Sequence, residues 1–533
     1  MASERFRPGT NVKGDVGGAN WSYLLPSLEL DRVVCLGRPS RPALATLAGL
    51  GEVTVWPSGR ADLPAGSANL VVVPALPRRR GARAGRLREA ARLLGPDGVA
   101  YIEGRFRVRI GNTAPLWVAP AAGEVRLAAP ARDREATAYL ERRFLNPRVL
   151  RSQLLRRPRR VLARQPTIGR LVGRRAALLA ADGHADGPPR YIRSLAAAAG
   201  IDLDGRRWAF AAPGEYPSQK VLLFLFGPAG ADPEALVKIT RDPSLNFRLE
   251  NEWRALSELA DREIGTEQTV PRPLFLGFHA GRAVLGETAV HGTPFRERTQ
   301  ATAECPHALA AVDWLLELGE ATAARADPDS DAAVSRLGEL FDEFARAYHL
   351  PSAQQDVLAG HVAALAGGER LPLVFQHGDP GPWNVLVTGD GRPAFLDWEA
   401  AESRGMPLWD LFHFVRSYGL AVSRADGTRD RQASFEEHFL AGSALTGVLV
   451  DATARFCART RLSPSLVEPL FYVCWMHRAV KEAATLPPEG LEASKYLGIL
   501  RLALERRDSP GLERLFAAGA PDGARALGAV NAN

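Results

Sequence analysis

The block at residues 374–410 constrains the fold of this chain more than any other part of it. The apolar segment VFQ leads into a His-Gly-Asp loop, and the next apolar segment, NVLV, returns through TGDGRP to AFLDW. Two apolar runs joined by a short glycine-containing turn are typical of a β-hairpin. The block therefore predicts a hairpin that brings three oxygen-bearing side chains together, those of Asp379, Asn384 and Asp397.

These three side chains have the chemistry that phosphoryl transfer requires. The reaction needs a carboxylate beside the attacking hydroxyl, and oxygen ligands for a Mg²⁺ ion that neutralises charge on the β- and γ-phosphates. Asp379, in the loop after the first strand, is the predicted catalytic residue, which accepts or orients the hydroxyl proton. Asn384 opens the next strand and Asp397 ends the last one, so both are predicted metal ligands.

Length and composition limit the class of protein. A chain of 533 residues is too long for one core, so we expect two or three domains. Hydrophobic residues make up 46% and charged residues 24%, which is typical of a soluble globular protein. No segment approaches the roughly 20 apolar residues of a membrane-spanning helix, and the N-terminus lacks the apolar core of a signal peptide. The expected location is the cytoplasm.

The cysteines are too scattered to form a zinc site, since they include no CxxC pair and no cluster with histidine. We expect four buried thiols: Cys35, Cys305, Cys457 and Cys474.

Residues 31–104 alternate short apolar segments with a helical pattern, which predicts a parallel sheet flanked by helices. The strand candidates are DRVVCLG, GEVTVWP, ANLVVVPAL and GVAYIEG. Between the last two, Leu87, Ala91 and Leu94 recur at helical spacing before Gly95 and Pro96. The N-terminal part therefore has a Rossmann-like α/β pattern.

Arginine is concentrated after this region and accounts for much of the net charge of +7. The segment 142–175 combines these arginines with leucines in the pattern of an amphipathic helix. We favour a solvated basic helix that links two domains; the alternative is a surface for an anionic membrane or an acidic partner. Nucleic acid is a weaker candidate, because no aromatic residues interleave the run for base stacking.

After residue 200 the pattern changes to short strands, WAFAA, VLLFLF and ALVKIT, followed by one helix. In that helix Leu249, Trp253, Leu256 and Leu259 fall three or four residues apart, so one face is apolar. The remainder of the chain, outside the 374–410 block, has a mainly helical pattern.

The motif HGDxxxxN followed by Asp-Trp-Glu resembles the aminoglycoside phosphotransferase and choline kinase-like family. The matching residues are His377, Gly378, Asp379, Asn384, Asp397, Trp398 and Glu399. The resemblance covers roughly residues 200–510. It implies a bilobal, protein-kinase-like α+β fold, ATP or GTP as donor with Mg²⁺, and a small-molecule hydroxyl as acceptor. Many members carry a second histidine where this chain has Gly381.

The resemblance also implies supporting roles around the catalytic loop. Asp410 would brace the loop, and His377 would hold its shape through backbone hydrogen bonds. Glu399 is either a further carboxylate beside the metal ligands or a solvated residue at a strand end.

For the nucleotide, the resemblance implies a clamp in the upstream half. Lys238, on a strand, would pair the α- and β-phosphates, and Glu252, on the amphipathic helix, would fix that lysine through an ion pair. Ser218 and nearby backbone groups would cover the phosphates. Residues around Glu287 to Gly292 resemble the hinge between lobes that meets the adenine.

Residues 20–110 resemble, in order, the sheet segments of class I S-adenosylmethionine methyltransferases. Such enzymes need a glycine-rich turn after the first strand and usually an acidic residue at the end of the second. Here only Gly37 remains in the turn, beside Arg38 and Pro39, and the second strand ends in Trp56-Pro57. We expect a degenerate, non-catalytic module.

The predicted organisation is therefore multidomain. It comprises a Rossmann-like domain (1–135), an Arg-rich linker (136–190), a kinase-like N-lobe (191–290), a helical C-lobe (291–518) and a flexible tail (519–533). The favoured function is a small-molecule kinase acting on an aminoglycoside, sugar or amino alcohol. The alternatives are a non-catalytic nucleotide-binding scaffold and a true methyltransferase with a kinase-like appendage.

Overall fold

The chain divides into two compact units, each described here by itself. The structure is a computed structural model in which residues 4–6, 19–77, 79–104, 113–119, 125–144, 174–180, 187–214, 219–324, 330–367 and 371–519 are described. Unit 1 comprises Met1–Trp253 and Arg272–Ala289, and unit 2 comprises Arg254–Pro271 and Val290–Asn533.

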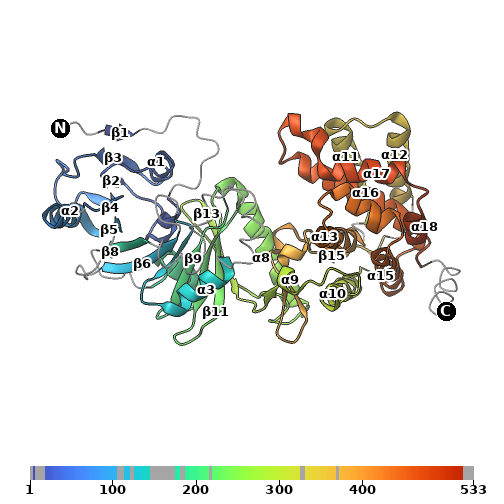
Figure 1. The fold of residues 1–533 in the computed structure, drawn as a ribbon, viewed down its shortest axis with the longest axis horizontal. Helices are drawn as coiled ribbons and strands as arrows, with labels where there is room; N and C mark the ends of the chain where they lie inside the picture. Colours follow the sequence, from blue (N-terminus) through green and yellow to red (C-terminus); the bar gives the residue numbers. More distant parts are fainter. Residues whose placement is uncertain are drawn as a thin grey trace. The chain divides into compact units, whose positions relative to one another are not determined.

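Among the described residues, one thirteen-stranded sheet runs through unit 1 in the order β1-β3-β2-β4-β5-β8-β6-β7-β9-β10-β11-β13-β12 (Figure 1). Its strands are β1 (Glu4–Phe6), β2 (Arg32–Leu36), β3 (Glu52–Trp56), β4 (Ala68–Val73), β5 (Leu94–Gly104), β6 (Thr113–Ala119), β7 (Leu127–Pro130), β8 (Arg174–Ala180), β9 (Arg207–Ala211), β10 (Val221–Phe226), β11 (Pro233–Ile239), β12 (Pro273–His279) and β13 (Arg282–Thr288). The helices of this unit are α1 (Arg41–Ala48), α2 (Arg80–Leu93), α3 (Arg134–Phe144), α7 (Arg190–Ala198) and the first half of α8 (Asn246–Asp261).

The N-terminal part of the sheet is parallel. Strands β3, β2, β4 and β5 pair in parallel and coincide with the four predicted strand segments. The apolar side chains of their central residues are buried because both faces of the sheet are covered, by one apolar cluster around Val33 and Leu70 and another around Val34 and Val71. This arrangement is compatible with the predicted Rossmann-like layout.

The Arg-rich region contributes regular structure on both sides of its central part. Helix α3 packs against β7 and β9 through Ala136 and Leu140, which are both fully buried. Strand β8, at residues 174–180, pairs antiparallel between β5 and β6, so the segment expected to be a linker also supplies a strand inside the sheet. Most of the amphipathic helix predicted for the segment 142–175 falls on residues 145–173, which lie outside the described residues.

The C-terminal part of the same sheet is antiparallel, and it carries the residues of the predicted nucleotide clamp. Strand β10 pairs with β9 and β11, and β11 pairs with β13, with Lys238 opposite Leu285. Helix α8 follows β11 after a turn that Asp242 caps by accepting a hydrogen bond from the Ser244 N–H. The predicted amphipathic face of α8 is observed, since Leu249, Leu256 and Leu259 are fully buried.

Unit 2 is mainly helical. Its longer helices are α10 (Pro306–Thr322), α11 (Ser330–Ala347), α12 (Ser352–Ala366), α13 (Trp409–Ala425), α15 (Ala444–Thr460), α16 (Val467–Ala483) and α17 (Lys495–Glu505). The shorter ones are α9 (Phe295–Arg298), α14 (Arg431–Phe435), the π-helical turn η6 (Glu436–Leu440) and α18 (Pro510–Phe516). Two small sheets complete it: β14 (Thr293–Pro294), β16 (Val385–Val387) and β17 (Pro393–Phe395) in one, and β15 (Val374–Gln376) with β18 (Glu402–Gly405) in the other.

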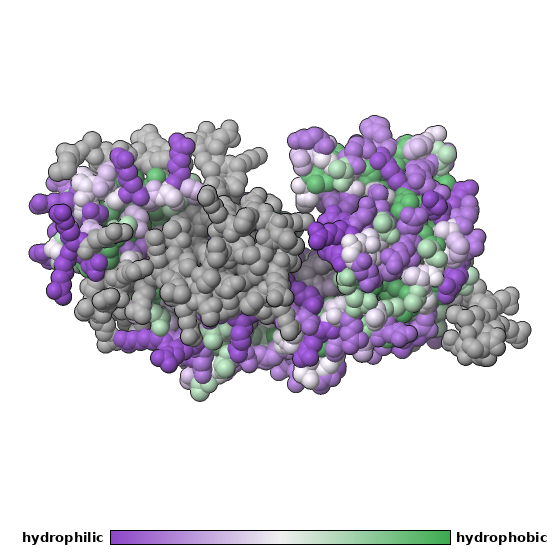
Figure 2. Space-filling model, viewed as in Figure 1, coloured by the Kyte–Doolittle hydropathy of each residue, from purple (hydrophilic) through white to green (hydrophobic). Residues whose placement is uncertain are grey.

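One apolar core holds the helices of unit 2 together. Its largest fully buried side chains include Trp398, Trp475 and Tyr418, and helix α16 packs against α11, α12 and α17. The face of unit 2 seen in Figure 2 is mainly hydrophilic, with small hydrophobic areas scattered across it. The four cysteines of the chain are free and buried, as expected.

Among the described residues, no single helix is long and apolar enough to cross a membrane. The bent pair Arg431–Leu440 and Ala444–Thr460 meets the same test by length and composition only. Its apolar side chains, such as Phe435, Leu445 and Leu449, belong to the core of unit 2.

Candidate active site

The predicted catalytic loop connects β15 to β16 in unit 2, and its backbone needs a glycine at position 378. Gly378 has φ +78°, and a Cβ at this position would lie 2.0 Å from the Ala400 carbonyl oxygen. The buried Asp410, at the start of α13, accepts hydrogen bonds from the backbone N–H groups of His377 (2.6 Å) and Gly378 (3.1 Å). Asp410 therefore fixes the backbone that carries the next residue, Asp379.

His377 holds the same loop from its other side. Its ring is fully buried, with Nδ1 accepting a hydrogen bond from the Asp379 backbone N–H (3.3 Å) and Nε2 donating to the Leu396 carbonyl (3.0 Å). Both ring nitrogens are engaged with the backbone, so the geometry gives His377 a structural position.

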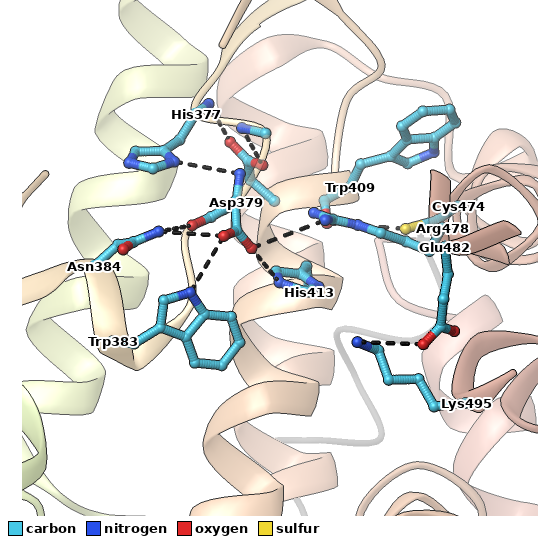
Figure 3. A network of polar contacts seen from close by, with 12 residues as sticks. His377, Asp379, Trp383, Asn384, Trp409, His413, Cys474, Arg478, Glu482 and Lys495 are labelled. Carbon is cyan, nitrogen blue, oxygen red and sulfur yellow. Dashed lines mark hydrogen bonds and ion pairs between the residues drawn. The ribbon is translucent and has the colours of Figure 1, made fainter. Parts of the chain in front are cut away.

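Four side chains contact the Asp379 carboxylate, which is 38% exposed (Figure 3). His413 Nε2 lies 3.1 Å from Oδ1, and the Arg478 guanidinium lies 4.0 Å from the same oxygen. The Trp383 indole N–H and the Asn384 amide each donate to Oδ2 at 3.2 Å. Both carboxylate oxygens are therefore held in place while part of the group still faces solvent.

The surroundings of Asp379 favour its ionised form. Burial acts to raise its pKa, but the hydrogen bond from His413, the charge of Arg478 and the hydrogen bond from Trp383 outweigh it and hold the pKa well below its usual range. Burial, together with the charge of Arg478, lowers the pKa of His413 to about 3, although Asp379 opposes the shift. Near pH 7 the His413 ring is therefore neutral, and its one N–H, on Nε2, points to Asp379.

The two predicted metal ligands lie close together along the β16–β17 hairpin. The Leu396 N–H donates to the Asn384 carbonyl (2.8 Å), which places Asn384 opposite the residue before Asp397. The Asn384 amide nitrogen also donates to the Asp379 carbonyl (2.9 Å), so the loop and the hairpin are joined. Asp397 has φ +69°, a left-handed conformation that is uncommon outside glycine and is often found at functional sites.

This donor set fits magnesium better than a transition metal. The described residues contain no group of three or more His, Cys, Asp or Glu side chains that could hold a metal ion. Mg²⁺ is usually bound by only one or two protein oxygens, together with substrate phosphates and water. One carboxylate, from Asp397, and one amide oxygen, from Asn384, are consistent with that pattern.

A second cluster of charged groups, in unit 1, contains the predicted clamp residues. Lys238 Nζ lies 2.7 Å from Glu252 Oε1 and 2.9 Å from Glu287 Oε1, and all three side chains are buried. Lys220 Nζ lies 3.4 Å from the other oxygen of Glu252. The strand lysine and the helix glutamate are thus paired.

Glu287 lies in the segment that resembles the hinge between lobes, and its side chain contacts Lys238. Burial raises the pKa of Glu287 to about 7, and the neighbouring Glu252 also raises it, although Lys238 opposes both. Two carboxylates share one buried lysine, so they cannot both ionise at low cost.

Two further predicted site residues are Ser218 and Glu399. Ser218 lies outside the described residues. Glu399 lies in the short 3-10 helix η5 (Trp398–Ala400) that directly follows Asp397, and it is half-buried.

Sequence reasoning missed four residues that the structure places in the clusters: Trp383, His413, Arg478 and Lys220. Trp383 stands inside the recognised motif, and Lys220 adjoins the segment expected to cover the phosphates, so position could have suggested both. His413 and Arg478 come from helices α13 and α16, and nothing in the local sequence indicates that they approach Asp379.

In the N-terminal part of unit 1, an arginine fills the turn where a Rossmann-like fold would receive a cofactor. The Arg86 guanidinium donates to the carbonyls of Leu36 (2.6 Å), at the end of β2, and Ser58 (3.0 Å), just after β3. A Cβ on Gly59 would lie 1.6 Å from this guanidinium, and one on Gly37 would lie 3.7 Å from it.

Comparison with known proteins gives one family match. Residues 223–451 match the family described as "Phosphotransferase enzyme family". No curated protein sequence matches the chain.

Solved structures resemble the chain more distantly. An aminoglycoside phosphotransferase from Streptomyces rimosus, in complex with ADP and streptomycin, is 19% identical over 48% of this chain and 90% of its own, with a TM-score of 0.31. A choline/ethanolamine kinase family protein from Mesorhizobium loti is 17% identical over 56% and 88%, with a TM-score of 0.32. A Plasmodium vivax ethanolamine kinase is 13% identical over 61% and 84%, also with a TM-score of 0.32.

Proposed function

Because residues 223–451 match the phosphotransferase enzyme family, we propose that this protein is a kinase that transfers the γ-phosphoryl group of ATP to a hydroxyl of a small molecule. The observation that carries the proposal is the Asp379 carboxylate, which is kept ionised, held through both oxygens and left partly open to solvent. A carboxylate that served only as a turn or cap would not need this set of partners.

In the proposed reaction, the acceptor's hydroxyl oxygen forms a bond to the γ-phosphorus as the bond from that phosphorus to the ADP oxygen breaks. The hydroxyl proton passes to Asp379 and then to solvent. A carboxylate with a lowered pKa is a weak base, so its main contribution is to orient the hydroxyl in a transition state with little bond formation. The hydrogen bonds from His413, Trp383 and Asn384 serve that orientation.

Asn384 and Asp397 would hold magnesium. The ion would neutralise charge on the β- and γ-phosphates of the donor. The hydrogen bond from Asn384 to the Asp379 carbonyl keeps the amide ligand in register with the catalytic carboxylate.

Lys238 is the proposed contact for the phosphates of ATP. Its ammonium group is held by Glu252 and Glu287, which leaves little freedom for the lysine side chain. Such a preordered cation loses little entropy when phosphate binds.

For the N-terminal part, we propose a methyltransferase-like module that does not bind S-adenosylmethionine. The Arg86 guanidinium donates hydrogen bonds to backbone carbonyls at the end of β2 and just after β3. Strand β3 ends at Trp56, which Pro57 follows, and not at an acidic residue. Its proposed role is to support the rest of unit 1, whose sheet continues from it.

The test is a calorimetric titration of ATP into the full chain with and without magnesium. We expect binding that strengthens with magnesium in the wild type and loses that dependence in Asp397→Ala. Asp390→Ala, which removes an exposed carboxylate from the same hairpin's turn, is the matched control and should bind as the wild type does. ATP binding that does not depend on magnesium, with no phosphoryl transfer, would favour the alternative class, a non-catalytic nucleotide-binding scaffold. Absence of ATP binding would refute the proposed function.

A further inference from the structure

The charges of two buried arginines act on His413, which donates to Asp379, and the proposed mechanism gives neither arginine a contact with the acceptor. Arg416, on α13, is 6% exposed, and Arg478, on α16, is 8% exposed. Burying a guanidinium away from water is costly unless a carboxylate or another anion compensates for it. Each arginine therefore needs a charge partner.

Arg416 lacks such a partner within the described part of the chain. Its Nη2 is buried and makes no hydrogen bond, and no carboxylate there lies within ion-pair distance of its guanidinium. Its guanidinium carbon lies 5.3 Å from the centroid of the Tyr496 ring, and the charge of Glu482 acts on it from beyond ion-pair distance. A cation–π contact offsets only part of the desolvation of a charge.

Arg478 has one recorded ion pair, the long contact of 4.0 Å to Asp379. The nearby Glu482, on the same helix, is already occupied: it accepts hydrogen bonds from Ser494 (2.8 Å) and the Tyr496 N–H (3.2 Å), and Lys495 lies 3.5 Å from it. Figure 3 shows Glu482 turned to Lys495 while Arg478 points to Asp379.

The two arginines and Asp379 all act on the His413 ring. His413 donates to Asp379, lies one helical turn before Arg416, and has its ring centroid 6.3 Å from that of Tyr496. Trp383, which is 61% exposed, lies on the solvent side of this group with its indole 6.1 Å from the His413 ring. An acceptor that brings its hydroxyl to Asp379 would thus meet positive charge and an aromatic face.

We propose that the acceptor is an anionic alcohol, whose carboxylate or phosphate group binds Arg416 and Arg478 while its hydroxyl lies at Asp379. This inference rests on the proposed kinase function. Carboxylate and phosphate groups can each accept two hydrogen bonds from the planar guanidinium of arginine. Polycationic acceptors such as aminoglycosides are disfavoured, because they would add positive charge beside Arg416, which has no ion pair, and Arg478, whose ion pair with Asp379 is long.

The test compares four small alcohols of similar size with the full chain and magnesium-ATP: glycerate, glycerol 3-phosphate, glycerol and ethanolamine. Binding is measured by calorimetry and transfer by ADP release. We expect glycerate or glycerol 3-phosphate to bind and react at least about 10-fold better than glycerol or ethanolamine, as a charge-assisted contact would give. A preference for glycerate assigns a carboxylate, and a preference for glycerol 3-phosphate assigns a phosphate.

The variant Arg416→Met removes the charge and keeps the length of the side chain. We expect roughly 10- to 100-fold weaker binding of the preferred anion, an unchanged affinity for magnesium-ATP, and recovery of part of the loss in Arg416→Lys. Melting temperature should not fall, because replacing an unpaired buried charge with an apolar side chain is neutral or stabilising. Arg429→Met, an exposed arginine in the loop after α13, is the control and should resemble the wild type.

Several outcomes would overturn the inference: equal or better use of glycerol or ethanolamine, no binding of either anion, or an Arg416→Met variant that loses ATP affinity or stability instead of anion binding. Failure of the proposed kinase function is distinguishable, because in that case magnesium-ATP itself would not bind.

Discussion

The buried cluster of Lys238, Glu252 and Glu287 makes a quantitative prediction for Lys238→Met. The substitution leaves two buried carboxylates without the cation that lies 2.7 Å and 2.9 Å from them. Removing one partner of a buried ion pair costs roughly 3–5 kcal/mol, because the remaining charge stays desolvated. Most of this cost should be independent of pH.

A smaller part of the cost should depend on pH through Glu287. Its pKa of about 7 lies above the value of an unfolded chain, so the folded state binds more protons and stability falls as pH rises from about 4.5 to about 7. Above pH 7 Glu287 ionises in the folded wild type as well. The fall in the wild type's free energy of unfolding that is due to Glu287 therefore stops at about 3 kcal/mol. Without Lys238, the pKa of Glu287 rises further, so Glu287 stays protonated at pH 8 in the folded variant. In the folded wild type, ionisation of Glu287 at pH 8 contributes about 1.4 kcal/mol of stability, which the variant lacks. At pH 6 that difference is nearly zero.

Hydrogen exchange of the β11 and β13 amides, measured at pH 6 and pH 8 and corrected for intrinsic exchange, tests this directly. We expect Lys238→Met to lose about 1.4 kcal/mol more protection free energy at pH 8 than at pH 6. The double variant Lys238→Met/Glu287→Gln should lose the pH difference. A loss of protection that is equal at pH 6 and pH 8, or a total loss below about 1 kcal/mol, would show that Lys238 does not compensate the charge of these buried carboxylates.

Three further predictions concern the loop and the N-terminal turn. Gly378→Ala places a Cβ 2.0 Å from the Ala400 carbonyl oxygen, at a residue with a positive φ. We therefore expect a lower melting temperature and ATP turnover reduced by at least about 100-fold. Turnover equal to that of the wild type would contradict the loop geometry. Asp410→Asn leaves one of the two loop N–H groups without a good hydrogen-bond acceptor. ATP turnover in steady-state assays should therefore fall about 10-fold while ATP affinity is unchanged. A loss of ATP affinity with unchanged turnover would argue that Asp410 does not brace the loop. S-adenosylmethionine should give no binding heat with the wild type in calorimetry, whereas clear binding would show that Arg86 does not close the turn.

The parts of the site that could be predicted from the sequence are those that lie close together along the chain. The hairpin between β16 and β17 depends on a short turn, so the spacing of Asn384 and Asp397 already indicated that they would meet, and the hydrogen bond from the Leu396 N–H to Asn384 joins the two strands there. The parallel strands β2 to β5 were equally visible, since strands buried on both faces give continuous apolar runs.

Contacts between distant segments were not predictable in this way. His413 reaches Asp379 from a helix whose apolar pattern describes only its packing, and Arg478 does so from another helix. The sequence around a buried arginine on an otherwise apolar helix does not indicate which side chain the arginine contacts.

Strand β8 illustrates a different limit. Its neighbourhood is dominated by arginine, which favours the interpretation as a solvated linker, and only the short run AALLA indicates a strand. Its place depends on pairing with β5 and β6, both distant in sequence, so tertiary structure and not local propensity decides it.

In the proposed mechanism, Asp379 promotes phosphoryl transfer from ATP. This role is tested most directly by comparing ATP turnover, with magnesium and the preferred acceptor or water, in the wild type and in Asp379→Asn, after both have been shown to bind magnesium-ATP. We expect turnover to fall by about 100-fold or more in the variant at unchanged ATP affinity, as loss of a positioned acid–base group would give. Equal turnover in the two proteins would contradict this role.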